Sequence, residues 1–366
     1  MPNYIYLDSK IVGAAYQIVQ YFKMGVFSSY NTTIYFKKYK ESFSNYSKIF
    51  QINHIHFKAF EKNSELNMQA GGVVFYLFNA QSNCRMVADR TLKHVFVTHG
   101  ESNKVSSIKP IIRIYDYVIT AGQMGINRYL NHKLFNIMDV EQGRLLMMGD
   151  TFVGENSYIY QGKADSILYA PTWEGGVPDE NYSSLEWNNI FDKLLNYLHN
   201  LQIKKLIVQP HPNLGHRLPS YKNSLYAGIK KLLQHGIFVT LVKDRVEALD
   251  YYFSLNYKNS FKISNKQKCL EIREAFCDIS AMEAQLYAKF IPVRVFIKSD
   301  SIDFDDDFLT HYYQQTAILK EMPITFYQDE FKQQFYDYIF GYTFPILSQK
   351  SLGERVSWLS DYVYEN

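Results

Sequence analysis

The sequence LIVQPHPNLGHRLPSYKNSLYAGIKKLLQHGIFVTLV, residues 206–242, contains one strand–helix–strand repeat. Leu206–Val208 and Ile237–Val242 are short apolar runs bounded by turn residues, a pattern typical of buried strands. Leu225–Leu233 lies between them and predicts a helix. Because strands joined through a crossover helix run parallel, this stretch predicts an α/β fold built on a parallel sheet.

The same alternation extends through most of the chain. A helix is predicted over Leu185–Leu201, where Ile190, Leu194, Leu195 and Leu198 recur at spacings of three and four. Further buried strands are predicted at Val73–Phe78, His94–Thr98, Tyr117–Thr120, Leu145–Met148, Ile167–Ala170 and Val293–Ile297. The pattern as a whole predicts doubly wound, Rossmann-like α/β domains.

The length indicates two such domains. The chain has 366 residues, more than one ordinary α/β core needs. The alternation breaks at Gly149–Lys163, a polar, glycine-containing stretch that we interpret as the interdomain linker. We therefore expect domains at about 1–150 and 160–300, followed by a helical tail over 301–366 that packs across both. Two facing domains of this kind enclose a cleft, and their ligands bind at the carboxyl ends of strands.

Composition excludes several classes of protein. The net charge of +3 is too small to indicate nucleic-acid binding. No apolar stretch reaches the roughly 18 residues of a membrane-spanning helix, and the N-terminus does not resemble a signal peptide. Three cysteines at irregular spacing favour neither disulfides nor a zinc site, which fits a reducing cytoplasm. Gly122-Gln123-Met124-Gly125 lacks the pattern of a dinucleotide-binding loop. We expect a cytoplasmic protein that also contacts the inner face of the plasma membrane.

Two histidines follow predicted strands. His99-Gly100 comes directly after the strand ending at Thr98, and an imidazole there can take a proton from an attacking hydroxyl group. His211 lies in Gln209-Pro210-His211-Pro212, where two prolines stiffen the backbone around it. The alternatives are a turn histidine and a rigid loop without a chemical role.

Two further segments suit phosphate groups. Pro171-Thr172-Trp173 follows a predicted strand and offers a hydroxyl group and backbone N–H groups. Asp278 and Ser280 stand just before a helix that begins near Ala281. Ser280 and Glu283 have the spacing of a capping box, which explains both residues without a ligand. The functional alternative is that the backbone N–H groups at the start of the same helix bind a diphosphate.

In this order the segments resemble the CDP-glycerol glycerophosphotransferase family, the teichoic-acid and capsule polymerases, which have a GT-B fold. The matching residues are His99-Gly100, Pro171-Thr172-Trp173, His211-Pro212 and Asp278-Ile279-Ser280. Tyr115–Thr120 and Met148-Gly149-Asp150 are similar to further family segments, and the likeness covers about residues 94–297. The chain departs from the usual family residues at Glu101-Ser102-Asn103-Lys104, Glu174 and Ala281.

The resemblance implies a transferase of surface-polysaccharide synthesis with a cytidine-nucleotide donor on the second domain. By resemblance, the nucleotide donor contacts Thr172, Trp173, Pro212, Asp278, Ser280 and Glu283. His99 would be the general base, His211 would stabilise the leaving nucleotide, and Gly100 and Lys104 would serve the acceptor, a glycan or a lipid-linked molecule. GT-B enzymes generally work without a metal, so we expect no cofactor.

Other interpretations stay open. The donor could be a CMP-activated acidic sugar, Kdo or sialic acid, used by related GT-B enzymes of capsule or lipopolysaccharide synthesis. The chain could also be a GT-B-like protein that binds a polysaccharide without catalysis. The acidic run of Asp303, Asp305, Asp306 and Asp307 is interpreted as a solvated helix start rather than a metal site.

Aromatic residues are abundant, with 31 Tyr and 26 Phe. Many fall in predicted strands and helices, and others concentrate in the tail. Phe331, Phe335 and Tyr338 lie at helical spacing there, which indicates either packing over the domain junction or an interfacial membrane helix.

Overall fold

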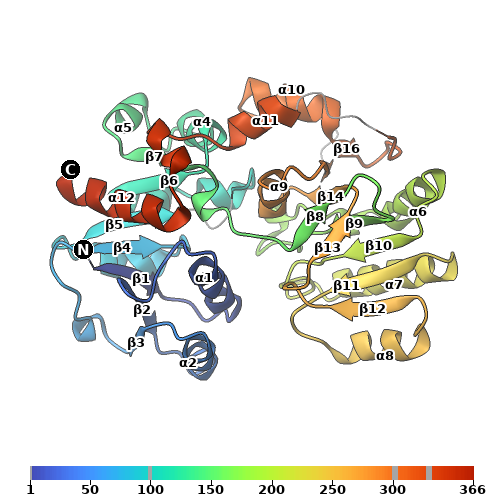
Figure 1. Cartoon of the computed structure of the whole chain (residues 1–366), viewed down its shortest axis with the longest axis horizontal. Coiled ribbons are helices and arrows are strands. Elements are labelled where there is room, and N and C mark those ends of the chain that lie inside the picture. Colours follow the sequence, from blue (N-terminus) through green and yellow to red (C-terminus); the bar gives the residue numbers. More distant parts are fainter. Residues whose placement is uncertain (1, 98–100, 299–303, 327–331) are drawn as a thin grey trace. The chain divides into compact units, whose positions relative to one another are not determined.

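The computed structural model describes residues 2–97, 101–298, 304–326 and 332–366. These form two compact units (Figure 1). Unit 1 comprises residues 1–101, 108–155 and 337–366, and unit 2 comprises residues 102–107 and 156–336. The chain leaves unit 1 within the predicted linker, and the tail divides between the units after Tyr336. Each unit is described by itself below.

Unit 1 is a doubly wound α/β domain. Its seven-stranded sheet has the order β3-β2-β1-β4-β5-β6-β7, and the paired strands run parallel. The strands are β1 (Asn3–Leu7), β2 (Thr32–Lys37), β3 (Phe57–Phe60), β4 (Val73–Tyr76), β5 (Lys93–Val97), β6 (Tyr117–Thr120) and β7 (Leu145–Met147). The helices are α1 (Gly13–Lys23), α2 (Phe43–Ile52), α3 (Cys84–Val87), α4 (Gln123–Asn131), α5 (Ile137–Glu141) and α12 (Leu352–Glu365).

Unit 2 repeats this plan. Its seven-stranded parallel sheet has the order β12-β11-β10-β9-β14-β15-β16. The strands are β9 (Ser166–Ala170), β10 (Lys205–Val208), β11 (Phe238–Val242), β12 (Phe261–Ser264), β14 (Ala275–Asp278), β15 (Val293–Ile297) and β16 (Ile318–Leu319), and a small separate sheet pairs β8 (Tyr158–Tyr160) with β13 (Leu270–Ile272). The helices are α6 (Ile190–Asn200), α7 (Ser220–Gln234), α8 (Ala248–Asn256), α9 (Ala281–Tyr287) and α10 (Asp307–Thr316). Helix α11 (Lys332–Ile339) begins in unit 2 and ends in unit 1.

These two domains have the GT-B architecture. Both are Rossmann-like, and the last helix, α12, returns to the first domain. It buries Val356, Leu359 and Val363 in the core of unit 1. The predicted fold class of two doubly wound α/β domains with a helical end is therefore confirmed.

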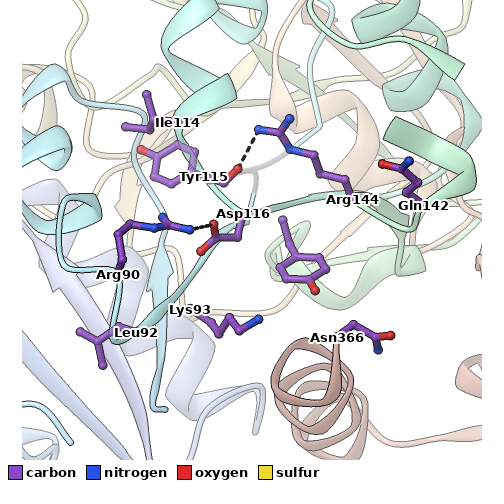
Figure 2. Close-up of a pocket in the computed structure, with 10 residues that line it drawn as sticks. Arg90, Leu92, Lys93, Ile114, Tyr115, Asp116, Gln142, Arg144 and Asn366 are labelled. Atoms are coloured by element: carbon purple, nitrogen blue, oxygen red, sulfur yellow. Dashed lines mark hydrogen bonds and ion pairs between the residues drawn. The ribbon is translucent and has the colours of Figure 1, made fainter. Parts of the chain in front are cut away.

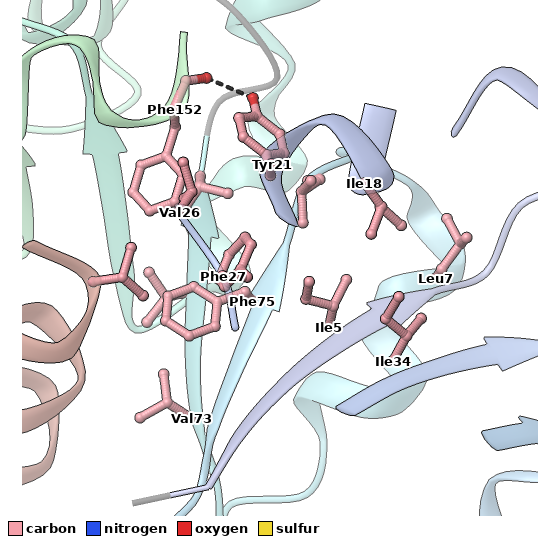
Figure 3. Packing of buried hydrophobic residues seen from close by; sticks show 14 of the residues in the cluster. Ile5, Leu7, Ile18, Tyr21, Val26, Phe27, Ile34, Val73, Phe75 and Phe152 are labelled. Carbon is pink, nitrogen blue, oxygen red and sulfur yellow. Dashed lines mark hydrogen bonds between the residues drawn. The ribbon is translucent and has the colours of Figure 1, made fainter. Parts of the chain in front are cut away.

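The strands form because apolar residues are buried on both faces of each sheet. Figure 3 shows one such layer in unit 1, where Ile5 and Phe75 from neighbouring strands pack with Ile18 of α1. In the same layer the Tyr21 hydroxyl donates a 2.6 Å hydrogen bond to the carbonyl oxygen of Phe152. Many tyrosines are thus core residues that use their one polar atom internally.

The predicted strands at Tyr117–Thr120 and Val293–Ile297 are confirmed residue for residue. Strands β1, β2, β3, β8, β12, β13, β14 and β16 were not predicted. The strand Asn3–Leu7 reads NYIYL and is buried throughout, with Tyr supplying apolar surface that a search for aliphatic runs overlooks. Helix α6 begins at Ile190, later than predicted, because Ser184–Glu186 forms a separate 3₁₀ turn.

The tail aromatics that the structure describes are mostly packed. Phe335 is buried, and its ring stacks on that of Tyr312 at a centroid distance of 3.7 Å and an interplanar angle of 8°. Tyr338 accepts a hydrogen bond from Asn127 at its hydroxyl oxygen. Phe331 lies outside the described residues. Phe335 therefore packs within unit 2, and the predicted packing over the domain junction stays a prediction.

The acidic run begins a helix. Asp306 caps α10, and its Oδ1 accepts a 2.8 Å hydrogen bond from the backbone N–H of Leu309. Asp303 lies outside the described residues. Among residues that are described, no cluster of side chains has the composition of a metal site, and no helix is long and apolar enough to cross a bilayer.

Candidate functional site

The strand order of unit 2 reverses between β9 and β14, and we call the carboxyl edge of these two strands the β9–β14 crevice. Strands β10, β11 and β12 lie on one side of β9, and β14, β15 and β16 lie on the other. The sheet is therefore wound in opposite directions from this point, where parallel α/β sheets bind ligands outside their carboxyl ends. Thr172 follows β9, and Asp278 is the last residue of β14. Two of the sequence-predicted segments thus meet at the expected edge.

Asp278 joins these segments. Its buried carboxylate accepts hydrogen bonds from the backbone N–H of Thr172 (2.6 Å) and of Ser184 (3.1 Å). Burial raises the pKa of Asp278 to about 7, against the lowering effects of these donors and of the Lys104 charge. Asp278 therefore positions the loop after β9. Its carboxylate oxygens are occupied by the protein.

Lys104 completes the crevice. It belongs to the short segment Ser102–Ser107, which is part of unit 2 although its neighbours in sequence are part of unit 1. Its Nζ donates a 2.8 Å hydrogen bond to Thr172 Oγ1 and lies 5.7 Å from the centroid of the Tyr182 ring. Burial lowers the pKa of Lys104 to about 8, and the nearby Asp278 charge opposes this shift. The resemblance grouped Lys104 with the acceptor, whereas the structure places its ammonium group at the Pro171-Thr172-Trp173 segment.

His211 stands beside the same segment. Its backbone N–H donates a 3.0 Å hydrogen bond to the carbonyl oxygen of Pro171, and its ring stacks on Trp173 with centroids 5.8 Å apart and an interplanar angle of 14°. The Nδ1 atom accepts a 3.1 Å hydrogen bond from the N–H of Asn213, so neutral His211 carries its proton on Nε2. The half-buried imidazole is held in one orientation by these contacts. Pro212, its neighbour, is exposed.

Glu174 explains one departure from the family pattern. Its buried carboxylate accepts hydrogen bonds from the N–H groups of Gly215 (2.9 Å), Arg217 (2.7 Å) and Leu218 (2.8 Å). Burial acts to raise the pKa of Glu174, but these N–H donors outweigh it and leave the pKa lowered. Gly175 has a φ of 72°, and a Cβ there would lie 2.5 Å from the carbonyl oxygen of Glu180. Glu174 thus holds the loop after His211 against the loop after β9.

The predicted capping box at α9 is wrong. Ser280 occupies the N-cap position, but its side chain makes no capping hydrogen bond. The Glu283 carboxylate instead accepts hydrogen bonds of 2.9 and 2.7 Å from the Tyr313 hydroxyl group of α10. Burial raises the pKa of Glu283 to about 8, so this side chain is largely neutral at pH 7. The spacing suggested a local contact, but a tyrosine from a distant helix provides a closer donor.

His99 and Gly100, the proposed base and its neighbour, lie outside the described residues. Glu101 beside them is buried in unit 1, where it pairs with Arg128 and accepts a 3.0 Å hydrogen bond from the Ala121 N–H. The roles predicted for His99 and Gly100 stay predictions.

Unit 1 has a polar group at its own winding reversal, between β1 and β4. Asp8 directly follows β1 and is buried. Its carboxylate accepts hydrogen bonds from Tyr39 (2.5 Å) and, at 3.5 Å, from Tyr6. Burial, with the Asp8 hydrogen bond and charge, raises the pKa of Tyr39 to about 12, and the Arg85 charge opposes the shift. Sequence analysis missed Asp8 because it missed β1.

A cavity of about 580 Å³ lies at the opposite edge of the unit 1 sheet (Figure 2). Its lining includes Lys93 and Tyr117, which begin β5 and β6, together with Arg90, Asp116 and Arg144. Figure 2 shows the Arg90–Asp116 ion pair, whose atoms are 2.5 Å apart. Since this is the amino end of the strands, the cavity is not at the edge where such folds bind their ligands.

Several residues of the site were not predicted from sequence. Ser184 and Tyr313 contact predicted residues, and Tyr182 lies beneath the Lys104 ammonium group. None stands next to a strand end, so a search of strand ends could not find them. Glu174 was visible only as a departure from the family pattern.

Comparison with known proteins finds distant structural similarity. No protein-family model and no curated protein matches the chain. Anabaena HepE in complex with UDP-glucose has a TM-score of 0.48 at 9% identity, over 99% of this chain and 100% of that chain. The lipopolysaccharide outer core galactosyltransferase WaaB has a TM-score of 0.43 at 9% identity, over 99% of this chain and 96% of that chain. Acinetobacter baumannii MurG has a TM-score of 0.41 at 7% identity, over 100% of both chains. Similarity this low does not transfer an activity, and the fold assignment above rests on strand order.

Proposed function

We propose that the chain is a GT-B transferase of surface-polysaccharide synthesis. It moves a glycerol-phosphate-like or sugar group from a nucleotide-activated donor to a hydroxyl group of a glycan or lipid-linked acceptor. One observation carries the proposal: the segments of Thr172 and Asp278, 106 residues apart, meet at the crevice of unit 2 with the partly buried Lys104 cation beside them. A cation and a hydroxyl group at the carboxyl edge of a parallel sheet suit the phosphates of a nucleotide.

The proposed chemistry breaks the bond between the transferred group and the nucleotide. The acceptor oxygen forms the new bond and gives its proton to a base, while the nucleotide leaves with additional negative charge. Lys104, which hydrogen-bonds Thr172, and His211, held against Trp173, supply positive or donor groups near those phosphates. The Ser280 hydroxyl group is the third candidate hydrogen-bond donor to these phosphates, because it is not used to cap α9. Protein cations thus do the work of a metal, and we propose a metal-independent reaction.

Roles for the remaining predicted residues follow. Asp278 positions the loop that carries Thr172. Glu283 forms a buried pair with Tyr313, so its carboxyl group would reach a ribose only after breaking that hydrogen bond. For the base, His99 is the resemblance-based candidate. Asp8 is a second candidate, because it is a buried carboxylate at the corresponding edge of unit 1.

The donor nucleotide is proposed to be a cytidine nucleotide, on the sequence resemblance alone. A CMP-activated acidic sugar is the alternative donor, and a polysaccharide-binding protein without catalysis is the alternative class. Both alternatives have the same fold. The polysaccharide-binding protein is the one that would bind no nucleotide.

A ligand screen followed by a transfer assay tests the proposal. Thermal unfolding is measured with CMP, CDP, UDP and ADP, because a ligand that binds the folded state raises the unfolding temperature. Stabilisation by CMP or CDP supports the cytidine assignment, and stabilisation by UDP or ADP alone overturns it. No stabilisation by any nucleotide overturns the transferase. Transfer from labelled CDP-glycerol, CDP-ribitol and CMP-Kdo then compares His211→Ala and His99→Ala with the unchanged chain. Full activity in both variants contradicts the mechanism.

A further inference from the structure

Helix α8 of unit 2 exposes an apolar face. Its sequence is ALDYYFSLN, and it packs beside β12, the edge strand of the sheet (Figure 1). Asp250 and Phe253 point inward and are buried. The outward residues Tyr251, Tyr252 and Leu255 are 62%, 56% and 67% exposed. A helix on the surface of a globular protein normally presents polar residues to water, so this pattern is inverted.

The inward face of α8 makes both polar and apolar contacts. Asp250 pairs with Lys243 at 2.8 Å and also bonds the Tyr226 hydroxyl, while Phe253 packs in the unit 2 core. Asp250 and Phe253 are the buried residues of α8. Tyr251 and Leu255, spaced four apart, are left on the solvent side, with Leu249 and Val246 also partly exposed nearby.

The surroundings of this face are cationic. Residues 243–268 contain six Lys or Arg and three Asp or Glu. The three acids are Asp244, Glu247 and Asp250, and each is paired with a lysine. The remaining cations have no acidic partner among the described residues: they are Arg245, Lys258, Lys262 and Lys268.

We propose that α8 and its flanking cations bind an anionic lipid surface, with the helix lying in the plane of the interface. Tyrosine suits this position because its ring is apolar and its hydroxyl group stays in the headgroup layer. One short helix buries too little apolar surface for tight binding alone, so the attraction of Arg245 and Lys258 to anionic headgroups is required.

The charge distribution selects this occupant over a second copy of the chain. Two copies that met through α8 about a two-fold axis would bring the Arg245 and Lys258 charges of one copy toward those of the other, with the nearby acids already paired. An anionic bilayer complements both the exposed apolar side chains of α8 and the cations that flank them. The proposal is independent of the proposed transferase activity, since none of these residues lies at the β9–β14 crevice.

Phe335 of the aromatic tail does not supply such a surface. The sequence allowed an interfacial helix through Phe335, but that side chain is buried against Tyr312. Membrane contact, if it is through α8, should therefore survive changes in the tail and fail with changes in α8.

Co-sedimentation with lipid vesicles tests the proposal on the full chain. One vesicle contains equal amounts of phosphatidylcholine and phosphatidylglycerol, and the other contains phosphatidylcholine alone. We expect binding to the first that falls about tenfold in a Tyr251→Ser/Leu255→Ser variant and by a similar factor in an Arg245→Gln/Lys258→Gln variant. The matched control is Tyr30→Ser/Ile52→Ser, which removes an exposed aromatic and an exposed aliphatic side chain from unit 1. The control should bind like the unchanged chain.

Each contrary result is informative. Absence of binding, equal binding to both vesicles, or unchanged binding by the α8 variants would overturn the proposal. Sedimentation equilibrium without lipid tests whether the α8 face binds a second copy of the chain instead. A dimer that Leu255→Ser converts to a monomer would assign the face to that second copy. Thermal unfolding of each variant checks that it remains folded. Because the tested residues are exposed, its unfolding temperature should stay close to that of the unchanged chain.

Discussion

The Lys104 ammonium group donates a 2.8 Å hydrogen bond to Thr172 Oγ1, across 68 residues of sequence. The contact brings a segment whose sequence neighbours belong to unit 1 into the crevice of unit 2. It also gives the crevice a cation whose charge depends on pH near neutrality, since burial lowers the pKa of Lys104 to about 8. The first prediction follows from this dependence.

Nucleotide affinity should fall as the pH rises from 7 to 9. The protonated form of Lys104 is the form that attracts phosphate, and it is lost as the pH passes through about 8. Lys104→Met should weaken nucleotide binding about 10- to 100-fold at pH 7, the range for a lost charge-assisted hydrogen bond, and should remove this part of the pH dependence. Isothermal titration at several pH values measures both effects.

Lys104→Arg provides the rescue. Its guanidinium stays charged at pH 9, so the variant should keep more affinity there than the unchanged chain does. Lys163→Met, which changes an exposed lysine of unit 2, is the control and should have no effect. A binding constant that is independent of pH in the unchanged chain would contradict the assigned role.

Glu174→Gln should loosen the loop after His211. The carboxylate accepts from three backbone N–H groups, and the amide that replaces one oxygen cannot accept from Gly215. We expect faster amide hydrogen exchange at Gly215 and weaker nucleotide binding, by about 1–3 kcal/mol if the N–H stays unpaired. The control is Glu271→Gln, at an exposed position. Unchanged exchange at Gly215 would show that Glu174 does not hold this loop.

Asp278→Asn should gain stability relative to the unchanged chain as the pH rises from 5 to 9. The folded-state pKa of about 7 lies above the ordinary value of 3.8, so the Asp278 contribution to stability is full below pH 3.8 and is lost as the pH rises through 7. The asparagine amide stays neutral but presents its NH₂ to one of the N–H groups of Thr172 and Ser184, which should cost roughly 1–3 kcal/mol at every pH. Urea denaturation at several pH values separates these two effects, and a difference that does not vary with pH would contradict the assigned ionisation.

Glu283→Gln should remove a pH-dependent destabilisation. The folded-state pKa of about 8 lies above the ordinary value of 4.5, so the Glu283 contribution to stability is full below pH 4.5 and is lost as the pH rises through 8. Glutamine stays neutral and can still accept from the Tyr313 hydroxyl group. The variant should therefore gain unfolding temperature over the unchanged chain on going from pH 5 to 9.

The gain should be about 2–4 °C for each kcal/mol recovered. Glu141→Gln, at an exposed position of unit 1, should follow the unchanged chain at every pH. A Glu283→Gln difference that does not vary with pH would contradict the assigned ionisation.

The sequence by itself determined the α/β class, the two-domain plan and the loops that carry the proposed site. Strand and helix periodicities are local, so runs such as Tyr117–Thr120 are visible without a structure. Polar residues directly after such runs lie at the carboxyl edge of a sheet by necessity, which is why Thr172 and His211 could be named in advance.

Only the tertiary structure decided which of these residues meet. Strand order puts β9 beside β14, and no local pattern specifies that neighbour. The same holds for Lys104 in unit 2 and for Glu283, whose partner Tyr313 comes from another helix rather than from its own first turn. Burial of a carboxylate or an ammonium group requires a partner wherever the fold supplies one, so those contacts, and the pKa values that follow from them, belong to the folded chain.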